Sequence, residues 1–125
     1  MHANRLRWLL PCALLLALTA NAAPVEYGTQ GGGGTMLLDR ERHSVSIDVL
    51  GVNAHSCAVR GRLTGAKPDR VEAEQGCTFQ LQAKAQGMFT VVVDEAARDA
   101  CRGHCGARAW FEGDYLPLPA ACTQA

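Results

Sequence analysis

The chain has 125 residues, which is enough for one small domain, and its twelve basic residues balance its twelve acidic ones. This balance excludes the strongly basic surface typical of nucleic-acid-binding proteins and gives no indication of a partner at a membrane surface. The chain has six cysteines, and whether they form disulfides depends on the cellular compartment.

The N-terminus has the features of a secretory signal peptide. Arg5 and Arg7 precede an apolar run over residues 8–20, and the small-residue pattern Ala20-Asn21-Ala22 follows. The run is shorter than the roughly 20 residues that a membrane-spanning helix needs. We therefore expect residues 1–22 to be a signal peptide, and the mature protein to be periplasmic or secreted without membrane insertion.

The cysteines that remain after cleavage predict a disulfide framework, because exported thiols are usually oxidised. They are Cys57, Cys77, Cys101, Cys105 and Cys122. Cys122 follows a Pro-Leu-Pro segment and is expected to be unpaired or intermolecular. The other four allow three pairings, among which we favour Cys57 with Cys77, joining neighbouring strands, and Cys101 with Cys105, closing a tight turn.

The mature chain is expected to contain one β domain over residues 36–116. Residues 23–35 include four consecutive glycines and are predicted to be a flexible leader, because glycine loses much backbone entropy on ordering. Residues 117–125 are predicted to be an irregular tail.

Apolar residues alternate with polar ones along most of this domain, and a period of two indicates strands. Gly51, Gln75-Gly76 and Gln86-Gly87 mark turns between them. A change of period indicates one short helix at residues 94–101. The expected strands cover residues 36–38, 43–50, 55–63, 71–74, 77–84, 89–93 and 107–112.

The fold class expected from this order is all-β. Five to seven short strands joined by turns, with one short helix late in the chain, favour a small antiparallel β-barrel or sandwich stapled by disulfides. No long helical pattern is present that would connect parallel strands.

The sequence carries no recognised catalytic motif, and we do not expect an enzyme. His104 between Cys101 and Cys105, or His55 near Cys57, could resemble a metal site. However, export favours oxidation of these thiols, and the spacing differs from that of zinc motifs. We therefore expect neither a metal nor another cofactor.

The segment 101–115 has instead the composition of an interaction surface, since Arg, Trp and Tyr are common interface anchors. In the competing interpretation Trp110 only covers a sheet edge or the barrel mouth. Gly103, Gly106 and Gly113 are then glycines because their backbones adopt positive φ. The tentative binding residues are Gly103, His104, Gly106, Arg108, Trp110 and Tyr115.

The spacing of these residues also resembles a known group of proteins. The pattern consists of Asn53-Ala54-His55-Ser56-Cys57, then Cys77, then Cys101-x-x-x-Cys105-Gly106-Ala107-Arg108-Ala109 and a later Phe111-Glu112-Gly113-Asp114-Tyr115. It is similar to small exported bacterial domains associated with lysozyme inhibitors of the LprI type, although the helical inhibitor part is absent here. Residues 105–108 also resemble the Ser-Gly-x-x-Tyr loop of the C-type lysozyme inhibitors MliC and PliC, with Cys105 in place of the serine and Ala109 in place of the tyrosine.

This resemblance implies a binding module of the periplasm, with inhibition of a lysozyme or another peptidoglycan hydrolase as the leading hypothesis. The loop from Gly103 to Arg108 would enter the cleft of the hydrolase, and Arg108 or His104 would bind its two catalytic carboxylates. The alternative is a structural, assembly or interaction domain of the cell envelope that inhibits nothing.

Overall fold

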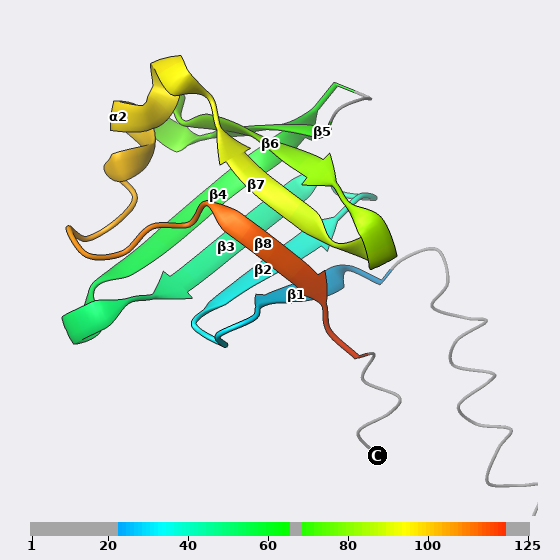
Figure 1. Ribbon diagram of the computed structural model, residues 1–125. Helices are drawn as coiled ribbons and strands as arrows, with labels where there is room; N and C mark the ends of the chain where they lie inside the picture. Colours follow the sequence, from blue (N-terminus) through cyan, green and yellow to red (C-terminus); the bar gives the residue numbers. More distant parts are fainter. Residues whose placement is uncertain (1–22, 66–68, 120–125) are drawn as a thin grey trace, which may run out of the picture. The chain divides into compact units, whose positions relative to one another are not determined.

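The computed structural model describes residues 23–65 and 69–119, of which Pro24–Leu118 form one closed antiparallel barrel (Figure 1). Each strand pairs with its neighbours in sequence, and β1 pairs with β8 to close the barrel. The strands are β1 (Val25–Thr29), β2 (Gly34–Asp39), β3 (Ser44–Leu50), β4 (Ser56–Thr64), β5 (Asp69–Ala73), β6 (Thr78–Ala83), β7 (Phe89–Val93) and β8 (Gly113–Pro117). The all-β barrel is confirmed, and the predicted five to seven strands are corrected to eight.

The first strand lies within the segment that was expected to be a flexible leader. Tyr27 of β1 is buried and pairs with Met36, and its ring packs edge to face against Phe89 at 5.4 Å between ring centroids. Gly31, Gly32 and Gly33 lie in the turn that leads into β2, where Gly32 has a φ of 79°, and Gly34 begins the strand. The prediction was wrong because burial of Tyr27 offsets the entropy lost by the glycines.

The last strand also differs from the prediction, since β8 covers Gly113–Pro117 rather than residues 107–112. Residues 103–112 cross one end of the barrel instead. The ordered structure extends past the predicted start of the tail, because the backbone N–H of Leu118 donates to Glu26 at 2.8 Å and the Leu118 side chain covers Gly28. The predicted signal peptide and Cys122 lie outside the described residues.

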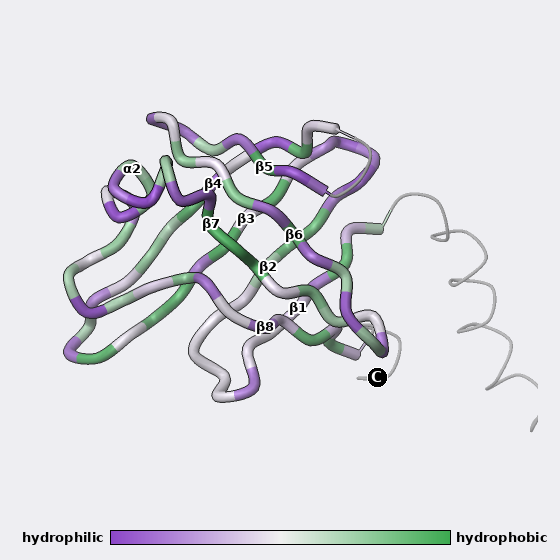
Figure 2. The backbone as a smooth tube through the Cα atoms, turned by 45° about the horizontal axis from the view of Figure 1, so that its top comes forward, coloured by the Kyte–Doolittle hydropathy of each residue, from purple (hydrophilic) through white to green (hydrophobic). Residues whose placement is uncertain are grey.

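The barrel interior is filled by the inward-facing side chains of all eight strands and of the segment between β7 and β8. Alternation along each strand places apolar residues inside, as the sequence predicts, and β7 forms a continuous hydrophobic stretch in Figure 2. The largest fully buried side chains are Tyr115, Phe79, Phe111, Met36, Ile47 and Leu81.

Three of the hairpins close through two-residue turns with positive φ at both positions. They are Asn53–Ala54, Gln75–Gly76 and Gln86–Gly87. Such turns match the right-handed twist of antiparallel strands. The turns predicted at the two Gln-Gly pairs are therefore confirmed.

One end of the barrel, here called the disulfide end, contains the turns that follow β1, β3 and β5 and the longer crossover between β7 and β8. The crossover begins with a 3-10 turn, η6 (Glu95–Ala97), and the short helix α2 (Arg98–Arg102), which confirms the predicted helix. The remaining 3-10 assignments, η3 (Val52–Ala54), η4 (Glu74–Gly76) and η5 (Ala85–Gly87), fall on hairpin turns. Cys101 and Phe111, both 0% exposed, close this end of the core.

No helix within residues 23–65 and 69–119 has the length and apolar character needed to cross a membrane.

Candidate functional site

Two disulfides attach the crossover to the barrel, and their pairing differs from the one we favoured. Cys57 is bonded to Cys105, and Cys77 is bonded to Cys101. The predicted Cys57–Cys77 bond was wrong because β5 lies between β4 and the start of β6, so these strands are not neighbours. The predicted Cys101–Cys105 bond was wrong because Cys101 faces the core from α2, whereas Cys105 pairs with β4.

Backbone hydrogen bonds on both sides of Cys105 hold the loop after α2 against the first residues of β4. The N–H of Ala58 donates to the carbonyl of His104 at 3.1 Å, and the N–H of Gly106 donates to the carbonyl of Ser56 at 2.8 Å. Together with the Cys57–Cys105 disulfide, they fix the loop at three adjacent points.

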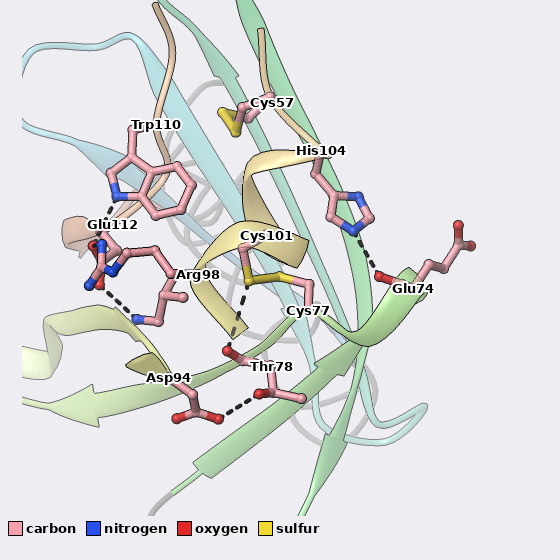
Figure 3. Close-up of a disulfide and its surroundings, with 12 residues drawn as sticks. Cys57, Glu74, Cys77, Thr78, Asp94, Arg98, Cys101, His104, Trp110 and Glu112 are labelled. Carbon is pink, nitrogen blue, oxygen red and sulfur yellow. Dashed lines mark hydrogen bonds and ion pairs between the residues drawn. A yellow bond between two sulfur atoms is a disulfide. The ribbon is translucent and has the colours of Figure 1, made fainter. Parts of the chain in front are cut away.

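His104 attaches the same loop to a second hairpin. Its Nε2 lies 2.8 Å from the carbonyl oxygen of Glu74 in the turn between β5 and β6, as Figure 3 shows. This contact occupies one ring nitrogen of His104, whose side chain therefore supports the loop.

Gly106 is a glycine because of close packing rather than because of its backbone angles. A Cβ at this position would lie 2.7 Å from Nδ1 of His55. Of the three glycines for which we expected positive φ, only Gly113 has it, at 142°. Gly103 has a φ of −63° and ends α2 in an ordinary helical conformation.

Trp110 belongs to a network that connects the crossover to β7. Its Nε1 donates to Oε1 of Glu112 at 2.9 Å, and Arg98 donates to the same oxygen at 3.1 Å (Figure 3). The guanidinium of Arg102 lies 5.1 Å from the centre of the Trp110 ring, within cation–π range. Trp110 is thus partly buried, and these contacts occupy much of its surface.

Glu112 is the centre of this network. Burial raises the pKa of its carboxyl, but hydrogen bonds from Trp110, the Val93 backbone and Arg98, together with the Arg98 charge, outweigh burial and lower the pKa overall. Glu112 is therefore a structural carboxylate at the point where the crossover enters β8.

Arg108 has different surroundings, because its side chain is exposed and makes no hydrogen bond or ion pair with any residue of the described ranges. Its backbone lies against the turn between β3 and β4, where a Cβ on Gly51 would be 2.7 Å from the Arg108 carbonyl oxygen. Leu50 and Val52, on either side of Gly51, are 65% and 62% exposed, the highest values among the large apolar residues described.

This corner of the disulfide end therefore combines one exposed guanidinium with two exposed aliphatic side chains. We call Leu50, Val52 and Arg108 the corner patch. Leu50 and Val52 are not among the binding residues predicted from the sequence, although two large apolar residues that flank a turn glycine are a signal of an exposed apolar patch.

The structure distributes the predicted binding residues among different roles. Gly103 and Arg108 are exposed, whereas His104 and Gly106 support the loop and Trp110 is partly buried. Tyr115 is only 1% exposed, and its hydroxyl donates to the Phe111 carbonyl at 2.8 Å. It is a core residue, so its inclusion among the binding residues was wrong.

Two surface hollows of the described barrel lie away from the corner patch. One of about 320 Å³ lies on the outer face, and another of about 470 Å³ lies at the end opposite the disulfides. The first is lined by Glu26, Thr35, Met36, Leu37, Ser46, Asp48 and Arg60, and the second by Arg40, His43, Leu63, Gly65 and Asp69. Within residues 23–65 and 69–119, no group of three or more His, Cys, Asp or Glu side chains could hold a metal ion.

The fold and site define a disulfide-bonded, eight-stranded antiparallel barrel with exposed apolar and basic side chains at one corner. Comparisons with protein-family models, curated proteins and solved structures gave no match to this chain.

Proposed function

We propose that this protein is an exported binding module that inhibits a lysozyme-type peptidoglycan hydrolase by inserting the corner patch into its cleft. The observation that carries the proposal is the exposed Arg108 side chain on a loop held by a disulfide, next to the turn that exposes Leu50 and Val52. Two disulfides in a barrel of this size support export, because such bonds persist in oxidising compartments.

The charge of Arg108 suits the catalytic centre of such an enzyme. Most glycosidases act through two carboxylates that flank the bond to be cleaved. A guanidinium can donate two parallel hydrogen bonds to a carboxylate, and these bonds strengthen where water is excluded. Arg108 is ready for this contact because no described side chain neutralises it.

The aliphatic part of the corner patch supplies burial on binding. Leu50 and Val52 would lose contact with water on entering a cleft. This burial would contribute about 25 cal/mol of favourable free energy per Å² of apolar surface. Arginine is enriched among the residues that contribute most to interface affinity, and the buried core of an interface is more apolar than its rim.

The stiffness of the loop reduces the entropy lost on association. The loop that carries Arg108 is held by the Cys57–Cys105 disulfide and by backbone hydrogen bonds on both sides of Cys105. A segment already fixed in its bound conformation loses less freedom when a partner captures it.

The first experiment measures inhibition of C-type, G-type and I-type lysozymes by the oxidised mature protein. We expect inhibition of at least one class at micromolar concentration or below. Arg108→Ala should weaken inhibition at least about 30-fold, as removal of a central interface residue does. Absence of inhibition of all three classes by the wild-type protein would overturn the proposal.

Arg62→Ala is the matched control. Arg62 is also exposed, but it lies on β4 opposite Ser44, far along the strand from Cys57. Its removal changes the net charge by the same amount and should leave inhibition within about threefold, as expected for a surface charge outside the contact. Equal loss in both variants would indicate nonspecific charge attraction instead of insertion.

Co-purification from the cell envelope tests the identity of the partner. A hydrolase captured by wild-type protein and lost with Arg108→Ala supports inhibition. A partner of another kind captured through Arg108 would favour the alternative, an interaction domain of the envelope that inhibits nothing.

A further inference from the structure

The two disulfides of the disulfide end differ in burial. Cys77 and Cys101 are both 0% exposed and belong to the hydrophobic core. In the other bond Cys57 is 2% exposed, but Cys105 is only partly buried against the core. A reductant in solution therefore reaches Cys105 before it reaches any other bonded cysteine of the described barrel.

The two bonds also hold different structures. Cys77–Cys101 attaches the buried face of α2 to the residue that precedes β6, so its loss disturbs the core. Cys57–Cys105 attaches a loop in which Gly103, Ala107 and Arg108 are exposed. Apart from the disulfide, the loop joins β4 through two backbone hydrogen bonds, and the eight-stranded ladder closes without it.

We propose that Cys57–Cys105 is a dithiol-reducible bond that controls the position of the corner patch, whereas Cys77–Cys101 is a permanent structural bond. Reduction leaves residues 103–109 attached to β4 by two backbone hydrogen bonds and to the β5–β6 turn by His104, and a segment held by so few contacts opens locally at low free energy while the barrel stays folded. The effect on binding rests on the proposed function, whereas the selective reduction does not.

The reaction is a two-step exchange with a dithiol. A thiolate of the reductant attacks Sγ of Cys105, and the Cys57–Cys105 bond breaks as the new S–S bond forms. Cys57 leaves as a thiolate and takes a proton from water. The second thiol of the reductant then displaces Cys105, so the reductant ends as a cyclic disulfide and the protein gains two electrons and two protons.

The experiment uses the mature protein without denaturant. Thiols already free are blocked with N-ethylmaleimide, dithiothreitol is added, and samples are alkylated with iodoacetamide over time and mapped by mass spectrometry. We expect Cys57 and Cys105 to be labelled at least about tenfold faster than Cys77 and Cys101, since the rate of exchange depends on access. Circular dichroism should retain the barrel signal, while amide exchange should accelerate in residues 103–109.

Labelling of Cys77 and Cys101 first, or of all four cysteines together with loss of the barrel signal, would overturn the proposal. Cys57→Ser/Cys105→Ser, which cannot form the bond, gives a second measurement that needs no reductant. It should fold as a barrel with rapid amide exchange in the same loop; slow exchange there would contradict the proposal.

Inhibition assays separate this inference from the proposed function. If the oxidised protein inhibits a lysozyme, the reduced protein should inhibit at least about tenfold less, because the loop is no longer fixed for binding. Equal inhibition by both forms would overturn the control of binding. If the oxidised protein inhibits nothing, the proposed function fails, and the labelling still decides whether the bond is selectively reducible.

Discussion

The carboxylate of Glu112 accepts a hydrogen bond from the backbone N–H of Val93 at 2.7 Å. Val93 ends β7, and β8 begins only at Gly113, so a side chain from the crossover satisfies the donor that a longer β8 would have paired. The same carboxylate holds Trp110 and Arg98. Glu112 thus connects β7 with Arg98 of α2 and with Trp110 of the crossover.

Glu112→Gln should destabilise the barrel by about 1–3 kcal/mol, because hydrogen bonds to a charged acceptor are lost or weakened. Chemical denaturation measures the change. Glu95→Gln is the control: the Glu95 side chain is 92% exposed and its contact with Arg98 is 3.8 Å long, so a change within about 0.5 kcal/mol is expected. Equal effects of both variants would contradict the central role of Glu112.

Stability should fall as the pH falls below about 4.5, the region in which unfolded carboxylates take up protons. The pKa of Asp94 is lowered by a hydrogen bond from Thr78, against burial, and further by hydrogen bonding and charge from Arg70; the pKa of Glu112 is also lowered overall. A carboxyl whose pKa is lower in the folded than in the unfolded protein stabilises the fold at pH values above its unfolded pKa. This stabilisation is lost as the pH falls through the pKa of the folded protein. Denaturation midpoints at pH 2–7 should show a shallower decline for Asp94→Asn/Glu112→Gln. An unchanged slope would exclude these carboxylates as the cause.

Tyr115→Phe should cost about 1–3 kcal/mol, because the buried carbonyl of Phe111 loses its donor. Burial raises the pKa of the Tyr115 phenol, so this hydroxyl keeps its proton at neutral pH. Tyr27→Phe is the matched control, since the Tyr27 hydroxyl makes no hydrogen bond within the described barrel. Thermal unfolding of the two variants should therefore differ clearly, and the same midpoint for both would refute the assigned role.

Gly51→Ala should separate the turn after β3 from the loop that carries Arg108. The new Cβ would meet the Arg108 carbonyl oxygen at 2.7 Å and Cβ of Ala109 at 3.1 Å, and backbone must move to make room. We expect about 1–3 kcal/mol of destabilisation, typical of overpacking, together with weaker partner binding. Gly31→Ala, with nothing within 4 Å of its added Cβ, should leave both measurements nearly unchanged.

Ala54→Gly should stabilise the barrel by about 0.5–1 kcal/mol. Ala54 has a φ of 61°, a left-handed conformation that is strained for a residue with a Cβ, and relief of this strain exceeds the added entropy of the unfolded chain. Ala58→Gly, within extended β4, should instead destabilise by about 0.5–1 kcal/mol. Denaturation curves that shift in the same direction for both variants would argue against strain at Ala54.

The strands from β2 to β7, the Gln-Gly turns and the short helix could be predicted from the amino-acid sequence alone. The alternation of buried and exposed residues and the residue types of the turns are local properties of the sequence. They are enough to predict these elements because each strand pairs with its neighbours in the chain. The sequence also predicted which four cysteines form disulfides, namely Cys57, Cys77, Cys101 and Cys105.

The positions of β1 and β8 and the disulfide pairing depend on contacts between distant parts of the chain and could not be predicted from local patterns. Whether residues 25–29 are ordered depends on Tyr27 meeting Phe89, a contact between distant parts of the chain. Likewise, Cys57 reaches Cys105 because the crossover returns over the end of the barrel and pairs with β4. The corner patch has the same origin: Arg108 is far in sequence from Leu50 and Val52, and close packing at Gly51 places the two segments side by side.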